Sequence, residues 1–209
     1  MEHYTCSIGI VPISRNTRRE LIAESAIRII ARDGVRALTH RAVDREAHVP
    51  QGSTSYHAGT RCALIELIVD ALAAKTKADA EVLADAVHDR LKQQTRLDLD
   101  DLAGMIAELV ETLTARGDEM RARYALLLEL RDAPHLHATL TTDSQVHTIT
   151  REVTAAALAG AGLPASNDSA AALIALTDSL VFHRTAIDES LPIRSILTAY
   201  LRGCLRIPG

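Results

Sequence analysis

Residues 38–61 read LTHRAVDREAHVPQGSTSYHAGTR, and this stretch predicts two short helices joined by a tight turn. Thr39 is a suitable N-cap for the first helix because its side-chain oxygen can accept a hydrogen bond from a backbone N–H group. Pro50 suits the first turn of a second helix, where its missing N–H would have no partner, so we expect that helix over residues 51–57. Two short helices across such a turn form a helix-turn-helix, whose second helix enters the major groove of DNA.

The second predicted helix carries hydrogen-bonding side chains at positions where a core helix would carry leucines. Gln51, Ser53, Thr54 and Tyr56 have side chains that can bond base edges or the sugar-phosphate frame. We therefore expect sequence specificity to depend on these four side chains.

A longer region around this unit, residues 15–64, resembles the DNA-binding head of the tetracycline-repressor (TetR) family of bacterial transcription regulators. The resemblance rests on RRELIAESAIRIIARDGVRALT, V-P-x-G-S-T-S and T-R-x-A-L, which follow one another in that order. The chain departs from the family pattern at Asp44, His48 and Ala58, where the family usually has alanine, a turn glycine and a packing phenylalanine. A non-glycine residue in a left-handed turn carries an energetic cost, although His tolerates that conformation better than most residues.

The resemblance also implies an architecture. It implies an all-α protein of about nine helices, with a three-helix head and a larger helical domain for effector binding and dimerisation. No stretch alternates with a period of two, so no β-strand is expected. We expect residues 1–13 to form a flexible arm, residues 14–61 the DNA-binding head and residues 62–209 the larger domain.

Family members contact phosphates at the positions of Thr39, His57 and Arg61. From this role we expect Arg61→Ala to weaken binding to all DNA sequences similarly. The slope of log affinity against log salt concentration should fall in magnitude by about 0.9, the value for one lost phosphate contact. The full set of expected DNA contacts is Thr39, His40, Arg41, Gln51, Gly52, Ser53, Thr54, Tyr56, His57 and Arg61.

The charge distribution along the chain fits a DNA contact confined to one end. Residues 1–61 carry nine Lys and Arg against six Asp and Glu, whereas residues 62–209 carry fourteen against twenty-one, and the net charge is −4. A basic head on an acidic body is what an electrostatic footprint at one end requires.

The cysteines and the N-terminal residues indicate in which cellular compartment the protein is expected. The three cysteines, Cys6, Cys62 and Cys204, are far apart and form no C-x-x-C pair, so neither disulfides nor a zinc module is indicated. The first residues have no basic segment, and their apolar run is too short to span a bilayer. We expect a cytoplasmic protein with no membrane partner.

No catalytic motif is present, and this absence favours a binding protein over an enzyme. The sequence has no G-x-S-x-G motif, no phosphate-binding glycine loop and no H-E-x-x-H motif. His135, His137, His147 and His183 have no carboxylate or thiol at ligand spacing beside them, so we expect no metal ion and no cofactor. Ordinary surface or core positions, or contacts to an organic ligand, remain open for these histidines.

The last two predicted helices, residues 170–187 and 193–205, are apolar on more than one side. A helix of this kind must be covered twice, either within one subunit or by a second copy of the chain. We expect a homodimer with two-fold symmetry, which matches a palindromic operator. The expected interface residues are Leu173, Leu176, Leu180, Ile193, Ile196, Leu197, Tyr200 and Leu201.

The resemblance implies a ligand pocket inside the larger domain, enclosed by predicted helices over residues 99–115, 119–131, 136–159 and 170–187. A mostly aliphatic wall with a few donors predicts an apolar ligand with an acidic or hydrogen-bonding end, and poor stacking of planar cations. Alternatively, these side chains only pack the core. The expected ligand contacts are Met105, Leu109, Tyr124, Leu128, Arg131, His147, Arg151, Phe182 and His183.

Taken together, the sequence predicts a ligand-responsive transcription regulator, most often a repressor in this family. It would bind operator DNA as a homodimer and be released by a small-molecule effector. The alternative is an all-helical enzyme or carrier of small molecules, in which the helix-turn-helix is only structural.

Overall fold

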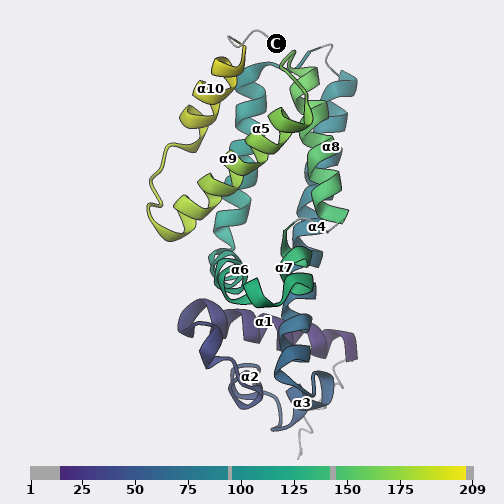
Figure 1. Cartoon of the computed structure of the whole chain (residues 1–209), viewed down its shortest axis with the longest axis vertical. Coiled ribbons are helices and arrows are strands. Elements are labelled where there is room, and N and C mark those ends of the chain that lie inside the picture. The colour runs from purple at the N-terminus through teal and green to yellow at the C-terminus, as the bar shows by residue number, and fades with distance from the viewer. Residues whose placement is uncertain (1–14, 94–95, 142–144, 206–209) are drawn as a thin grey trace, which may run out of the picture.

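The computed structural model describes residues 15–93, 96–141 and 145–205, and the arm expected over residues 1–13 lies outside them. The described residues are all-α with no strand, which confirms the predicted fold class. Ten α-helices and two short 3-10 helices follow in order (Figure 1): α1 (Arg15–Asp33), η1 (Val35–Ala37), α2 (His40–Glu46), α3 (Ser53–His57), α4 (Arg61–Gln93), α5 (Leu99–Ala115), α6 (Gly117–Glu129), η2 (Leu130–Asp132), α7 (Pro134–Leu140), α8 (Gln145–Gly160), α9 (Asn167–Ala186) and α10 (Ile193–Cys204).

The head consists of α1, α2 and α3, packed against the first turns of α4. Its core is aliphatic, and Ile22, Ile30, Leu38 and Leu64 are almost completely buried. The backbone turns from α1 into η1 at Gly34, whose φ of 81° lies in the region that favours glycine. The three helices of the head lie together at one end of the molecule (Figure 1).

The helix-turn-helix forms, with one boundary different from the prediction. Thr39 caps α2 as expected, because its Oγ1 accepts a hydrogen bond from the Ala42 amide at 3.1 Å. The second helix begins at Ser53 rather than at residue 51, so Pro50 precedes the helix instead of lying in its first turn. Gly52 supplies the left-handed residue that leads into α3, with φ 94° and ψ −8°.

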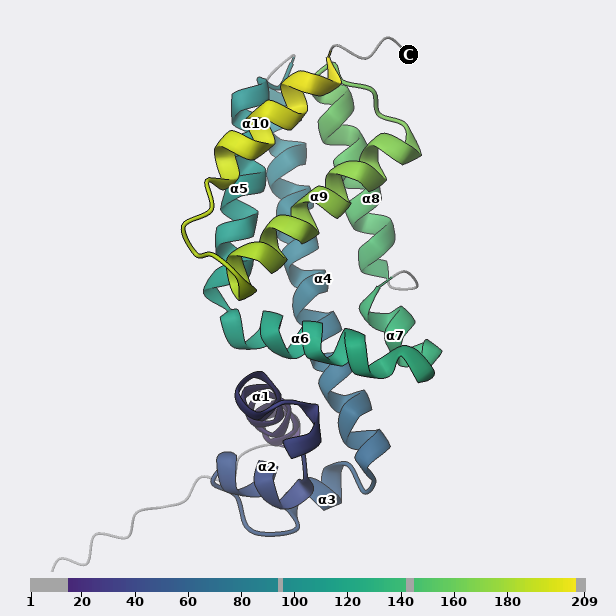
Figure 2. The same ribbon diagram turned by 60° about the vertical axis from the view of Figure 1, so that its left-hand side comes forward.

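Two helices connect the head to the larger domain. α4 runs for 33 residues, and its N-terminal part packs in the head while Val87 lies in the core of the larger domain. α6 crosses between α1 and the upper helices (Figure 2), and its Ala122 and Leu126 complete the core of the head. α4 and α6 therefore contribute side chains to the cores of both parts of the molecule.

The larger domain places α5, α8, α9 and α10 around the upper part of α4 (Figure 2). Its core holds aliphatic side chains from each of these helices, including Leu102, Leu158, Leu173 and Leu197. Within the described ranges, no helix has the length and apolar character needed to cross a bilayer.

Candidate functional site

Asp44 joins the two helices of the helix-turn-helix. Its side chain is buried with its residue only 4% exposed, and its carboxylate accepts hydrogen bonds from the Gly52 amide at 2.8 Å, the Thr54 amide at 2.8 Å and the Thr54 hydroxyl at 2.6 Å. Burial, the largest single influence, raises the pKa of Asp44, but the bonds from Thr54 and Gly52 together lower it below 3.8. At this departure from the family pattern, a carboxylate holds the turn and the start of α3.

The other two departures have simple structural consequences. His48 has a φ of 51°, so the turn keeps the left-handed geometry for which the family usually has glycine. Ala58 is buried, and its carbonyl oxygen lies 2.6 Å from Nε2 of His40. The turn therefore closes without either the glycine or the phenylalanine.

The expected DNA contacts fall into three groups by exposure. Thr39, Arg41, Gln51, Gly52, Tyr56 and Arg61 are exposed, whereas His40, Ser53 and His57 are half-buried. Thr54 is 0% exposed and bonded to Asp44, so its expected role as a base contact is wrong. Ser55 is exposed on α3, and its spacing of four residues from Gln51 could have placed it in the expected set.

Arg61 makes hydrogen bonds inside the head. Its guanidinium donates to the carbonyl oxygen of Val35 at 2.8 Å and to that of Leu38. These bonds tie the start of α4 to the segment between α1 and α2. The geometry favours a structural role over the phosphate contact expected from the sequence.

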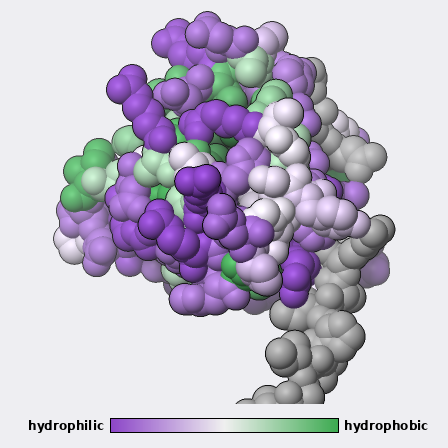
Figure 3. Space-filling model, turned by 90° about the horizontal axis from the view of Figure 1, so that it is seen from below, coloured by the Kyte–Doolittle hydropathy of each residue, from purple (hydrophilic) through white to green (hydrophobic). Residues whose placement is uncertain are grey.

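The end of the molecule that carries α2 and α3 presents a mostly hydrophilic surface (Figure 3). Exposed arginines on this part of the head are Arg36, Arg41 and Arg45. Tyr56 of α3 is 69% exposed, and its ring packs edge-to-face on that of His57 at 5.2 Å. This surface has the cations and hydrogen-bonding groups that a nucleic-acid contact needs.

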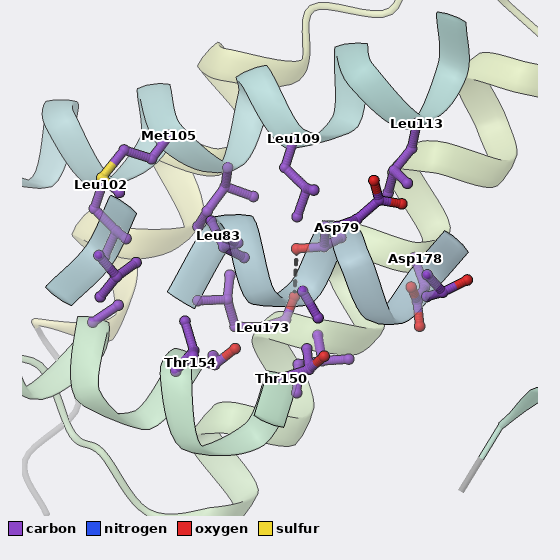
Figure 4. Close-up of a pocket in the computed structure, with 18 residues that line it drawn as sticks. Asp79, Leu83, Leu102, Met105, Leu109, Leu113, Thr150, Thr154, Leu173 and Asp178 are labelled. Carbon is purple, nitrogen blue, oxygen red and sulfur yellow. Dashed lines mark hydrogen bonds between the residues drawn. The ribbon is translucent and has the colours of Figure 1, made fainter. Parts of the chain in front are cut away.

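A cavity of about 130 Å³ lies in the larger domain between α4, α5, α8 and α9 (Figure 4). Its walls are mainly aliphatic, with threonines and two aspartates as the polar groups. The lining residues are Thr76, Asp79, Ala80, Leu83, Val87, Leu102, Met105, Ile106, Leu109, Leu113, Thr150, Val153, Thr154, Ala157, Leu173, Ile174, Thr177 and Asp178.

Only Met105 and Leu109 of the expected ligand contacts line this cavity. Leu128 is 76% exposed, and Arg131 is also exposed, because both lie on the outer side of their helical segments. Phe182 is 44% exposed and packs edge-to-face on Tyr124 at 5.0 Å. The remaining expected contacts, which also lie outside the cavity lining, are His147, Arg151 and His183.

α4 contributes one wall of the cavity that was not expected from the sequence. Thr76, Asp79, Ala80, Leu83 and Val87 line the cavity from this helix. Their spacing of three or four residues marks one face of a helix, so the signal was present in the sequence.

The polar end of the cavity carries Asp79 and Asp178, which lie toward the end marked by Leu113 in Figure 4. Asp79 forms an ion pair with Arg116. Asp178 has no hydrogen bond or ion pair with any residue that the structure describes. Burial raises the pKa of Asp178, and attraction by the charges of Arg123 and His147 offsets only part of this rise.

The described residues contain no group of three His, Cys, Asp or Glu side chains placed to hold a metal ion. The histidines singled out in the sequence lie on separate elements, and Nδ1 of His183 is buried without a hydrogen bond in the described structure.

The expected dimer residues are mostly internal. Leu176, Ile196 and Tyr200 are half-buried, and they remain partly accessible to a second subunit. The other five pack in the core of one subunit, so their assignment to the interface is wrong: Leu173, Leu180, Ile193, Leu197 and Leu201. Leu173 lines the cavity instead.

Comparison with known proteins agrees with this architecture. No curated protein matches the chain significantly. Among solved structures, the multidrug binding protein EbrR complexed with imidazole is 26% identical, with a TM-score of 0.58 over 92% of each chain. EbrR has also been solved in complexes with proflavin and with ethidium.

Two further structures are similar over almost their whole length. A TetR family member from Streptomyces coelicolor A3 is 27% identical, with a TM-score of 0.61 over 92% of this chain and 99% of that one. A transcriptional regulator from Rhodococcus sp. Rha1 is 21% identical, with a TM-score of 0.63 over 91% and 99%, and is similar in fold. Residues 97–207, more than half of the chain, match the family described as "Tetracyclin repressor-like, C-terminal domain". The chain belongs to the TetR family of transcriptional regulators.

Proposed function

We propose that this regulator is a repressor that binds a palindromic operator as a homodimer in the cytoplasm and is released when a small molecule fills the cavity. The observation that carries the proposal is a continuous set of contacts from the cavity wall to the head. EbrR, which binds imidazole, proflavin and ethidium, supports a small-molecule ligand for a relative of this fold.

Ion pairs form the first part of this connection. Asp79 of the cavity wall pairs with Arg116, whose Nη1 lies 3.4 Å from Oε2 of Glu119. The other oxygen of Glu119 lies 2.6 Å from Nζ of Lys75, and Nζ of Lys75 lies 3.9 Å from Glu24 on α1. Helix packing forms the second part, because α6 bears directly on α1. A ligand that moves α4 or α6 would therefore move α1 of the head.

In this proposal, α3 enters the major groove and presents Gln51, Ser55 and Tyr56 to base edges. Thr39 at the N-terminus of α2 and the exposed Arg41 contact phosphates. The carboxylate of Asp44 holds α3 at a fixed angle to α2, and a fixed angle is what positions side chains against base edges.

The dimer would form through the accessible faces of α9 and α10, as the two-fold symmetry of a palindromic operator requires. α9 exposes Ala171, Ala172, Ala175 and Ser179 beside half-buried Leu176. Small side chains let two helices approach closely, which suits a helix-against-helix interface.

Operator binding is tested by selecting DNA from random sequence with the full-length protein, followed by footprinting at moderate salt. A palindromic site protected by the wild type and lost in Tyr56→Ala supports the proposal. Glu152→Gln, a change on an exposed residue of α8, should leave the footprint intact. Sequence-independent binding alone would contradict it.

The connection to the head is tested by the ratio of operator affinities with and without a releasing compound from a small library. Lys75→Gln should reduce this ratio while the affinity for the compound stays the same. Lys77→Gln, two residues along the same helix, serves as the matched control. An unchanged ratio in Lys75→Gln would exclude the ion pairs as part of the route.

A further inference from the structure

The size and lining of the cavity restrict the shape of its ligand. Its volume is about 130 Å³, and an apolar cavity of about 150 Å³ holds one benzene molecule, so the space fits a body of about six carbon atoms. None of the 18 lining residues is aromatic. A planar polycyclic ring would therefore exceed the space and would find no side chain to stack on.

The charges of the lining restrict the chemistry of the ligand. No Lys, Arg or His lines the cavity, whereas Asp79 and Asp178 do (Figure 4). Arg116 already neutralises Asp79. Asp178 is the one carboxylate of the lining that has no ion pair within the described structure. Its residue is exposed to solvent, although protein atoms crowd the carboxylate from the cavity side.

The charged and titratable neighbours of Asp178 leave this carboxylate without a direct partner. On α6, Arg123 donates to Oγ1 of Thr76 at 3.3 Å and to the carbonyl of Leu140, so its guanidinium attracts Asp178 only from a distance. Burial raises the pKa of Tyr124 to about 12, so this phenol stays neutral. On α8, the charge of His147 lowers the pKa of Asp178.

A carboxylate in these surroundings disfavours its own charge. Crowding by protein atoms removes part of the water that would stabilise the anion, and this is why the pKa of Asp178 is raised. A cation that reached the carboxylate would replace the lost water, whereas an anion would add repulsion. Neighbouring Thr150 and Thr177 have hydroxyl oxygens that can accept hydrogen bonds from such a cation.

We propose that the cavity takes a compact aliphatic ammonium ion, with its nitrogen paired to Asp178 and its alkyl body against Leu109 and Leu113. This proposal differs from the acidic end that the sequence allows for the ligand, because the basic side chains expected in the wall lie outside it. The inference deepens the proposed repressor function by naming the effector class, and it uses the same cavity.

The test uses the full-length protein without DNA and cyclohexylammonium chloride as the probe, followed by calorimetric titration and thermal unfolding at pH 7. Cyclohexanol, cyclohexanecarboxylate and proflavin are the comparison compounds. The ammonium ion should bind most tightly and raise Tm, because a ligand that binds only the folded state stabilises it by mass action.

Asp178→Asn should weaken binding of cyclohexylammonium by roughly tenfold or more, the range for a charged hydrogen bond, and should bring its affinity close to that of cyclohexanol. The substitution should not unfold the protein, since it removes a charge that the fold disfavours, and Tm without ligand checks this. Asp85→Asn, which removes an exposed carboxylate of α4 outside the cavity, should leave the affinity unchanged.

The proposal is overturned if cyclohexylammonium fails to bind, if cyclohexanecarboxylate or proflavin binds as tightly, or if Asp178→Asn retains full affinity. Each of these results leaves the repressor proposal standing, because no DNA is present in the measurement. Conversely, ammonium binding by a protein that selects no operator would contradict the repressor function alone.

Discussion

The carboxylate of Asp44 accepts hydrogen bonds from both the backbone amide and the hydroxyl of Thr54, at 2.8 and 2.6 Å. Asp44 belongs to α2 and Thr54 to α3, so this pair joins the two helices across the turn. The family usually has alanine at the position of Asp44. In this chain a buried carboxylate therefore helps to set the angle of the helix that we propose reads DNA.

Asp44→Ala should lower the free energy of unfolding by about 2–3 kcal/mol, because it leaves buried donors of Thr54 and Gly52 without an acceptor. Urea denaturation followed by circular dichroism measures this change. Asp70→Ala, at an exposed position on α4, should stay within about 0.5 kcal/mol of the wild type. Equal effects of the two substitutions would show that the bonds of Asp44 do not stabilise the head.

The stability provided by Asp44 should depend on pH. Its pKa is lower in the folded protein than the ordinary value of 3.8, so the unfolded chain binds the proton more readily. The contribution is therefore present above about pH 4 and is lost as the pH falls through the folded-state pKa. The difference in unfolding free energy between wild type and Asp44→Asn should shrink from pH 5 to pH 3. A constant difference over this range would contradict the lowered pKa.

His48→Gly should be neutral or raise the free energy of unfolding by up to about 1 kcal/mol. The φ of 51° at His48 is costly for a residue with a Cβ atom, while glycine adds entropy to the unfolded chain and offsets part of the gain. His48→Val should be destabilising, since a β-branched residue fits this conformation poorly. Urea midpoints of the three proteins give the order, and greater stability of the valine variant would refute the prediction.

Arg41 and Arg61 should respond differently to substitution by alanine. Arg41→Ala should reduce the slope of log affinity against log salt by about 0.9, as one phosphate contact requires. Arg61→Ala should leave that slope nearly unchanged and lower the unfolding free energy by about 2 kcal/mol, because Val35 and Leu38 lose charged hydrogen-bond donors.

Arg131→Ala, an exposed arginine of η2, is the charge-matched control for both measurements. A slope reduced by about 0.9 in Arg61→Ala would instead restore the phosphate contact that the family resemblance implies.

Ala175→Arg should convert the proposed dimer into a monomer, because it places a long charged side chain on the exposed face of α9. Sedimentation velocity at micromolar concentration measures this, and operator affinity should fall with it. Ala86→Arg, on an exposed face of α4, should leave the dimer intact. A wild-type protein that sediments as a monomer would remove the basis of the dimer proposal.

In the head, the sequence predicted helix positions better than side-chain roles. The Thr39 cap and the glycine after α1 are local signals, and each acts within a few residues. Residue type assigned Thr54 to DNA, and the family resemblance assigned Arg61, but their partners come from 10 and more than 20 residues away. The sequence alone does not show whether a polar side chain forms its hydrogen bonds with DNA or with other groups of the same protein.

The sequence by itself determined the all-α class, the helix-turn-helix and the division into a basic head and an acidic body. Helix periodicity, caps and net charge depend on neighbouring residues, so these properties can be read locally. Only the tertiary structure decided that Leu173 lines the cavity rather than a dimer interface and that Asp178, not a basic group, is at its polar end. Which face of a helix meets a cavity depends on how α4, α5, α8 and α9 pack on one another, and that packing joins residues separated by as much as a hundred positions.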